Sequence, residues 1–114
     1  MDLLVRPVVA VTEQQLLAAV AAELAGQNRL AWHHCAASWR CAGPGGLPDL
    51  IIAGPGGLVL AELKAEHGEL SAGQDAWRWA LDYAGRNGPR PFRLWRPADW
   101  DSGRIQSELA LLAG

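Results

Sequence analysis

The chain has 114 residues, of which half are hydrophobic and 19% are charged. This length and composition predict one compact domain over residues 1–114 and exclude a disordered chain. The formal net charge of −2 argues against a protein that coats nucleic acid with a uniformly basic surface. Among the ten Lys and Arg residues only Lys64 is a lysine, so the chain keeps a single ammonium side chain.

Targeting and cysteine signals point to a reducing compartment. No apolar run approaches the length of a membrane span, and the N-terminus lacks the features of a secretory signal. We therefore expect a cytoplasmic protein, bacterial or in a phage-infected cell, with Cys35 and Cys41 as reduced thiols. Five residues separate these cysteines and no second ligand pair follows, so a zinc site is not expected beside His33 and His34.

Hydrophobic spacing and turn residues predict the elements in chain order. Residues 1–11 carry no periodic signal and are expected to form a loose arm. Thr12 with Gln15, and Ser71 with Gln74, have the spacing of helix capping boxes. The expected elements are a helix at 13–25, strands at 30–38, 49–53 and 58–64, a helix from 71 to about 84, a strand at 92–95 ended by Pro97, and a helix at 102–112.

This order, α-β-β-β-α-β-α, predicts an α/β fold with a mixed four-stranded sheet flanked by helices. The segment Gly54–Gly57 is typical of a hairpin turn, and it would pair the second and third strands. The glycine-rich loops lack the Gly-Lys-Ser/Thr signature of a phosphate-binding loop, so no nucleotide cofactor is expected.

The charged residues that are candidates for a catalytic or metal site lie on the predicted hairpin. Glu62 and Lys64 lie two residues apart on a strand and share a face, with Leu63 on the other. Asp49 is five residues before the turn and Glu62 five residues after it, so the two carboxylates could face each other. Paired carboxylates repel unless a cation lies between them, and oxygen ligands suit Mg²⁺ or Mn²⁺. A surface ion pair of Glu62 with Lys64 is the simpler alternative.

The residues Pro48-Asp49 and Glu62-Leu63-Lys64 resemble the motif of the PD-(D/E)xK nucleases. The wider context resembles their virus-type replication-repair nuclease (VRR-NUC) branch in its small stand-alone form. That resemblance covers about residues 12 to 112 and implies a restriction-endonuclease-like core of order α-β-β-β-α-β. It rests on Gly46-Leu47-Pro48-Asp49-Leu50, Ala61-Glu62-Leu63-Lys64, Gly68-Glu69-Leu70-Ser71 with Gln74 and Trp77, and Leu94-Trp95-Arg96-Pro97 with Asp99-Trp100.

The resemblance also implies roles for individual residues. Asp49 and Glu62 would bind Mg²⁺ or Mn²⁺ together with the backbone carbonyl of Leu63. Glu13 would reach the same ion directly or through water, although an acidic residue in a first helical turn is also favoured by the helix dipole.

Two further polar residues, one inside the motif and one outside it, are assigned in the same way. Lys64 would position the attacking water and stabilise developing charge. Gln74 would contact the scissile phosphate or the attacking water. Its role in the capping box of Ser71 is the alternative, and both could hold only if the side chain switches.

Contacts to DNA are harder to locate from sequence. His34 and Arg40 are candidates, beside Gln74. Trp77 and Trp95 are expected in the core, whereas base stacking or a dimer interface remains open for the other tryptophans. A basic face despite the net charge would draw on Arg40, Arg78, Arg86, Arg90, Arg93 and Arg96.

The expected function is metal-dependent DNA endonuclease activity on branched DNA, similar to that of a Holliday-junction resolvase, by a homodimer. A flap or linear-duplex nuclease of the same fold is one alternative. A non-catalytic DNA-binding or assembly module is another.

Overall fold

The computed structural model describes residues 12–34 and 43–114. The arm expected at 1–11, the strand residues expected at 35–38, Cys35, Trp39, Arg40 and Cys41 lie outside the described residues. Within the described part, no helix has the length and apolar character that a membrane crossing needs.

The described elements follow the predicted order with one addition. They are α1 (Glu13–Ala25), β1 (Ala31–His34), β2 (Leu50–Gly54), β3 (Gly57–Leu63), α2 (Ala72–Ala84), β4 (Phe92–Trp95), α3 (Pro97–Asp101) and α4 (Arg104–Ala113). Both predicted capping boxes are present, at Thr12 and at Ser71.

Helix α3 was not predicted, because Pro97 was interpreted only as the end of a strand. Proline is also favoured in the first turn of a helix, where its missing N–H has no partner to lose. Here Asp99 accepts a hydrogen bond from the backbone N–H of Arg96 at 2.8 Å and caps the helix.

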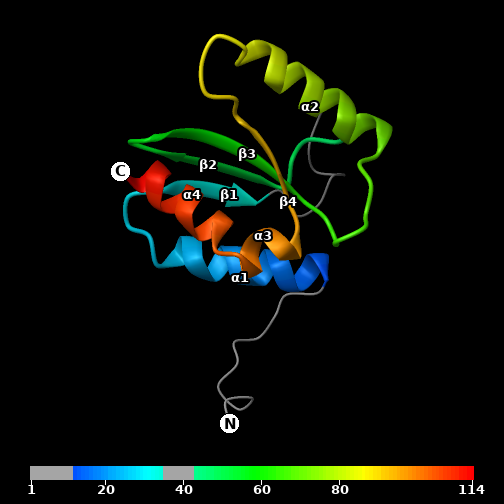
Figure 1. Cartoon of the computed structure of the whole chain (residues 1–114). Helices are drawn as coiled ribbons and strands as arrows, with labels where there is room; N and C mark the ends of the chain where they lie inside the picture. The colour runs from blue at the N-terminus through cyan, green and yellow to red at the C-terminus, as the bar shows by residue number, and fades with distance from the viewer. Residues whose placement is uncertain (1–11, 35–42) are drawn as a thin grey trace.

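The sheet is mixed, as predicted, and has the order β1-β2-β3-β4. The first three strands pair antiparallel, while β4 returns after α2 and pairs parallel with β3. Helices α1, α3 and α4 lie on one side of the sheet and α2 lies on the other (Figure 1).

The hydrophobic core lies between the sheet and the side that carries α1 and α4. Trp95 is fully buried there, as expected, and Trp100 packs against the core. Trp77 was expected in the core, but it is partly exposed and donates its indole N–H to the Pro44 carbonyl at 3.5 Å. Helix α2 contributes no buried residue, so it lies against the sheet without joining this core. The core residues are Leu16, Val20, Leu24, Leu30, Leu50, Ile52, Val59, Ala61, Leu63, Trp95, Ile105, Leu109, Leu112 and Ala113.

Candidate metal centre

The hairpin register brings Asp49 opposite Glu62. Leu50 pairs with Ala61 across β2 and β3, and Asp49 lies one step beyond that pair. The Asp49 side chain accepts a hydrogen bond from the backbone N–H of Leu63 at 2.9 Å, which ties it to the end of β3. The Leu63 main chain thus holds a carboxylate through its N–H, while a ligand role for its carbonyl stays a prediction.

Glu62 is the one buried charged residue among the described residues, with 1% of its surface exposed. One carboxylate oxygen, Oε2, accepts a hydrogen bond from the Gln74 side-chain amide at 3.0 Å. The other, Oε1, is buried and has no hydrogen-bond partner within the described part of the chain. A buried carboxylate oxygen without a partner is costly, so this atom requires a proton or a cation.

Glu13 completes an acidic cluster with Asp49 and Glu62. Each of these side chains offers a carboxylate oxygen, and the three oxygens lie within 4.8 Å of one another. Glu13 is the first residue of α1, whose start is fixed by the capping box of Thr12. Oxygens on opposite sides of Mg²⁺ lie about 4 Å apart, so the residues fit a divalent cation with small adjustments.

Burial and neighbouring charge shift the protonation of Glu62. The pKa of this carboxyl is raised from 4.5 to about 8, mainly because burial removes the water that would stabilise its charged form. The negative charge of Asp49, the hydrogen bond that the protonated carboxyl can donate to Asp49, and the charge of Glu13 raise the pKa further, while Lys64 lowers it. At neutral pH and without a cation, Glu62 therefore holds a proton, which a divalent cation would displace.

This shift predicts how stability depends on pH. A carboxyl with a raised pKa binds its proton more tightly in the folded chain, so its contribution to stability is lost as pH rises from 4.5 to about 8. Without divalent metal, Glu62→Gln should therefore gain stability over the wild type across this range. Urea unfolding at several pH values in EDTA measures the difference, and a difference independent of pH would contradict the shift.

Lys64 follows directly after β3, and its backbone N–H donates to the Trp95 carbonyl at 3.1 Å. The side chain is partly buried, and its stem passes close to Gly68. Because Lys64 lowers the pKa of Glu62, its ammonium group favours the charged carboxylate. The structure therefore brings together Glu13, Asp49, Glu62 and Lys64 at one end of the hairpin.

Gln74 takes part in the capping box of Ser71 and also contacts Glu62, a partner that was not predicted from the sequence. Its side-chain carbonyl accepts the backbone N–H of Ser71 at 2.8 Å, and its side-chain NH₂ donates to Glu62. The two ends of one amide thus serve the capping box and the carboxylate together, while the contact of Gln74 with a phosphate or an attacking water stays a prediction.

A close contact between glycines sets the distance from the Asp49 loop to α2. A Cβ at Gly46 would overlap the main chain of Gly73 and Gln74, and Gly46 also has a positive φ of 92°. The loop that leads to Asp49 therefore packs directly on the first turn of α2. Sequence reasoning missed this role and interpreted the glycines of this loop only as turn residues.

Gly46→Ala should lower the free energy of unfolding by about 1–3 kcal/mol, because the new methyl group overlaps packed backbone. Gly43→Ala is the matched control, since Gly43 also has a positive φ but nothing lies within 4 Å of its Cβ position. Chemical denaturation compares the two variants. Equal losses would show that φ alone, and not the contact with α2, accounts for the effect.

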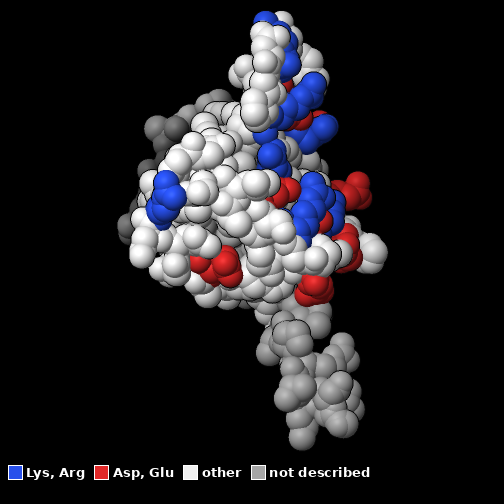
Figure 2. Space-filling view, turned by 60° about the vertical axis from the view of Figure 1, so that its left-hand side comes forward, with Lys and Arg blue, Asp and Glu red and all other residues white. Residues whose placement is uncertain are grey.

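The expected basic face is divided in the structure. Arg96 donates through one guanidinium nitrogen to the Ala65, Glu66 and Gly68 carbonyls, and Arg93 pairs with Glu108 at 3.0 Å. These two arginines hold the fold together. Arg78, Arg86 and Arg90 instead line one hollow, and Figure 2 shows basic side chains gathered around the part of the molecule where α2 lies.

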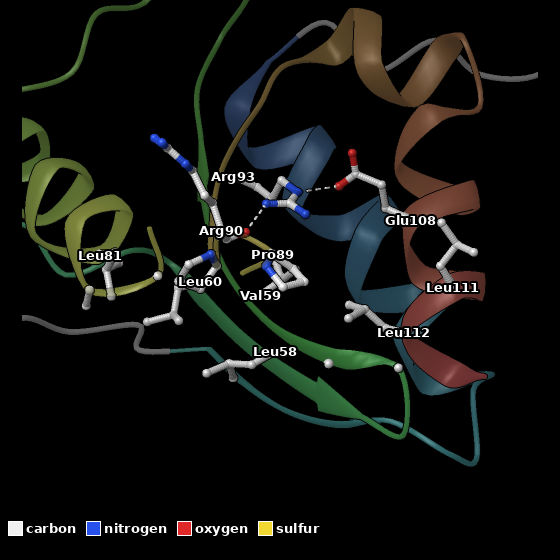
Figure 3. Close-up of a pocket in the computed structure, with 15 residues that line it drawn as sticks. Leu58, Val59, Leu60, Leu81, Pro89, Arg90, Arg93, Glu108, Leu111 and Leu112 are labelled. Atoms are coloured by element: carbon white, nitrogen blue, oxygen red, sulfur yellow. Dashed lines mark hydrogen bonds and ion pairs between the residues drawn. The ribbon is translucent and has the colours of Figure 1, made fainter. Parts of the chain in front are cut away.

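Further hollows lie on the surface of the described residues. His34 lines a hollow between β1 and α1, together with Trp32 and His33. An apolar hollow of about 610 Å³ lies between the start of β3, the end of α2 and α4 (Figure 3). The only carboxylate in its lining is Glu108, which is paired with Arg93, so this hollow offers no second acidic cluster.

Comparison with known proteins finds no relative of this chain. The chain matches no family model, no curated protein and no solved structure. The acidic cluster and the residues around it therefore carry the evidence on function.

Proposed function

We propose that this chain is a metal-dependent DNA endonuclease that hydrolyses phosphodiester bonds. The observation that carries the proposal is the partnerless, buried Oε1 of Glu62 beside the carboxylates of Asp49 and Glu13. Lys64 lies next to this cluster and supplies a positive charge. Buried acidic ligands with an adjacent ammonium group suit the hydrolysis of an anionic ester.

The acidic side chains would hold Mg²⁺ or Mn²⁺. Asp49 and Glu62 would be direct ligands, Glu13 would bind directly or through water, and the Leu63 carbonyl would add a main-chain oxygen. When bound, the cation supplies a water of lowered pKa and offsets the charge of the phosphate.

Of the remaining site residues, Lys64 stabilises negative charge on the phosphate and Gln74 orients the Glu62 carboxylate. The Lys64 ammonium stabilises the negative charge that builds on the phosphate as water adds and the bond to the leaving oxygen breaks. Lys64 acts electrostatically and not as a general base, because a bound cation would itself supply a water of lowered pKa. Gln74 is a positioning residue that fixes Oε2 of Glu62 and thereby leaves Oε1 directed to the cluster.

The topology supports the resemblance to the PD-(D/E)xK nucleases. An antiparallel β1-β2-β3 unit, a crossover through α2 and a parallel β4 follow the order that this resemblance implies. We include in the proposal a restriction-endonuclease-like core and a homodimer acting on branched DNA, because a two-fold dimer matches a symmetric junction.

Cleavage assays with Mg²⁺ or Mn²⁺ on four-way junction, flap and linear DNA test this proposal. Preferential cutting of the junction supports resolvase-like activity, whereas equal or better cutting of flap or linear DNA supports the alternative nuclease. DNA binding without cleavage of any substrate, unchanged in Glu62→Ala, would replace the proposal with a non-catalytic module.

A further inference from the structure

Helix α2 carries aromatic side chains that face solvent. Trp79 is 66% exposed and Tyr83 is 54% exposed, although both rings are large and apolar. The two rings stack, with centroids 5.5 Å apart and an interplanar angle of 5°. The guanidinium carbon of Arg86 lies 4.1 Å from the centre of the Tyr83 ring and extends the stack.

Cations surround this stack. Arg78 and Arg90 line the same hollow of about 320 Å³ as Trp79, Tyr83 and Arg86. Asp82 also lines it, and Asp75 pairs with Arg78 at 2.5 Å. Three arginines and two aspartates give this surface a net positive charge, although the whole chain has a formal net charge of −2. We call the five residues Arg78, Trp79, Tyr83, Arg86 and Arg90 the α2 aromatic face.

Flat rings between guanidinium groups match the chemistry of single-stranded nucleic acid. Unpaired bases stack on aromatic side chains, and the phosphates between them pair with arginines. A protein partner could also use Trp, Tyr and Arg. The positive charge of this surface favours a polyanion, so the observations point to nucleic acid first.

We infer that the α2 aromatic face binds single-stranded DNA, with a base stacked on the outer face of Trp79, which packs on Tyr83, and with phosphates held by the arginines. The inference rests on the proposed function for the choice of DNA. It goes further in assigning a separate surface for unpaired nucleotides to the helix that also carries Gln74.

The position of this face follows from the geometry of α2. Gln74, in the first turn of α2, contacts Glu62. Trp79 and Tyr83 follow five and nine residues later, and at about 100° per residue they lie roughly 140° and 180° around the helix axis from Gln74. The α2 aromatic face therefore lies on the side of α2 that points away from the acidic cluster, where it can hold an unpaired segment of the DNA without blocking the cluster.

Fluorescence anisotropy of the full chain with a labelled thymidine oligonucleotide of about 12 nucleotides tests the inference. The assay is run in EDTA, so binding is measured without cleavage. Trp79→Ala should weaken binding roughly fivefold to a hundredfold, as loss of a base-stacking residue does. Tyr83→Ala should also weaken binding, because Trp79 loses the ring on which it stacks. Leu111→Ala is the matched control, because Leu111 is a 75% exposed apolar residue on α4 and its loss should leave binding unchanged.

Two further measurements separate stacking from charge. An abasic oligonucleotide of the same length keeps the phosphates but removes the bases, and it should bind more weakly than the thymidine probe. Arg86→Gln and Arg90→Gln should each reduce the slope of log affinity against log salt by about 0.7.

Unchanged binding in Trp79→Ala and Tyr83→Ala would overturn the inference, as would equal binding of the abasic probe. Altered sedimentation of these variants with unchanged DNA binding would assign the face to contacts between chains instead. Binding in EDTA does not depend on catalysis. If the wild type cleaves DNA and Trp79→Ala still binds single-stranded DNA normally, the inference is wrong but the proposed function stands. If the wild type binds single-stranded DNA through the α2 aromatic face but cleaves no substrate, only the proposed function is wrong.

Discussion

Replacing Glu62 with glutamine should reduce cleavage by about 10²- to 10³-fold while leaving the fold intact. Glutamine keeps the shape of the side chain and a carbonyl that can accept the hydrogen bond of Gln74. It removes the charge whose buried oxygen has no other partner among the described residues. The rate of Mn²⁺-dependent cleavage, with circular dichroism to check the fold, measures this effect.

Glu108→Gln is the control for loss of a partly buried carboxylate elsewhere. Glu108 accepts hydrogen bonds from Arg93 at 3.0 Å and from the Trp95 indole at 3.2 Å. Its replacement should cost about 1–3 kcal/mol of stability but leave cleavage per folded molecule unchanged. The two variants are thus expected to separate stability from activity. Equal losses of cleavage in both would contradict a special role for Glu62.

Lys64→Arg should fold normally and lose cleavage by roughly a hundredfold. The guanidinium group is planar, broad and permanently charged, whereas an ammonium group is a compact point charge. Lys64 lowers the pKa of the buried Glu62 carboxyl, so the position of its charge relative to the acidic cluster matters, and the wider guanidinium group would displace that charge. Single-turnover cleavage at saturating DNA measures the effect on the reaction and not on binding.

Arg29→Lys provides the matched control for exchanging these two cations. Arg29 donates to the Gly114 carbonyl at the C-terminus, at an exposed position. This exchange should leave cleavage unchanged. Wild-type activity in Lys64→Arg would mean that the single lysine of the chain is only a consequence of its arginine-rich composition.

Local patterns predicted much of the fold. The capping residues Thr12 and Ser71 placed the starts of α1 and α2, because capping depends on residues only three positions apart. The Gly54–Gly57 turn fixed the hairpin, and counting outward from it placed Asp49 opposite Glu62. These features depend on short sequence separations, so a single sequence contains the necessary information.

Features that depend on tertiary packing could not be predicted in the same way. The burial of Glu62 and the missing partner of its Oε1 depend on how α1, α2 and the hairpin meet. The contact between Gly46 and Gly73 joins segments far apart in sequence. Trp77 has the helical spacing of a core residue, but α2 lies outside the core, so periodicity alone gave the wrong location.

Calorimetric titration of the chain with Mn²⁺ tests the central claim most directly. If Glu62, Asp49 and Glu13 form a metal centre, the wild type should bind Mn²⁺ and, at neutral pH, release the proton held by Glu62. Two buffers of different ionisation enthalpy reveal that proton, and Glu62→Gln should lose both binding and release while Glu108→Gln keeps them. Binding of Mn²⁺ that is the same in wild type and Glu62→Gln, or no binding to either, would contradict the account.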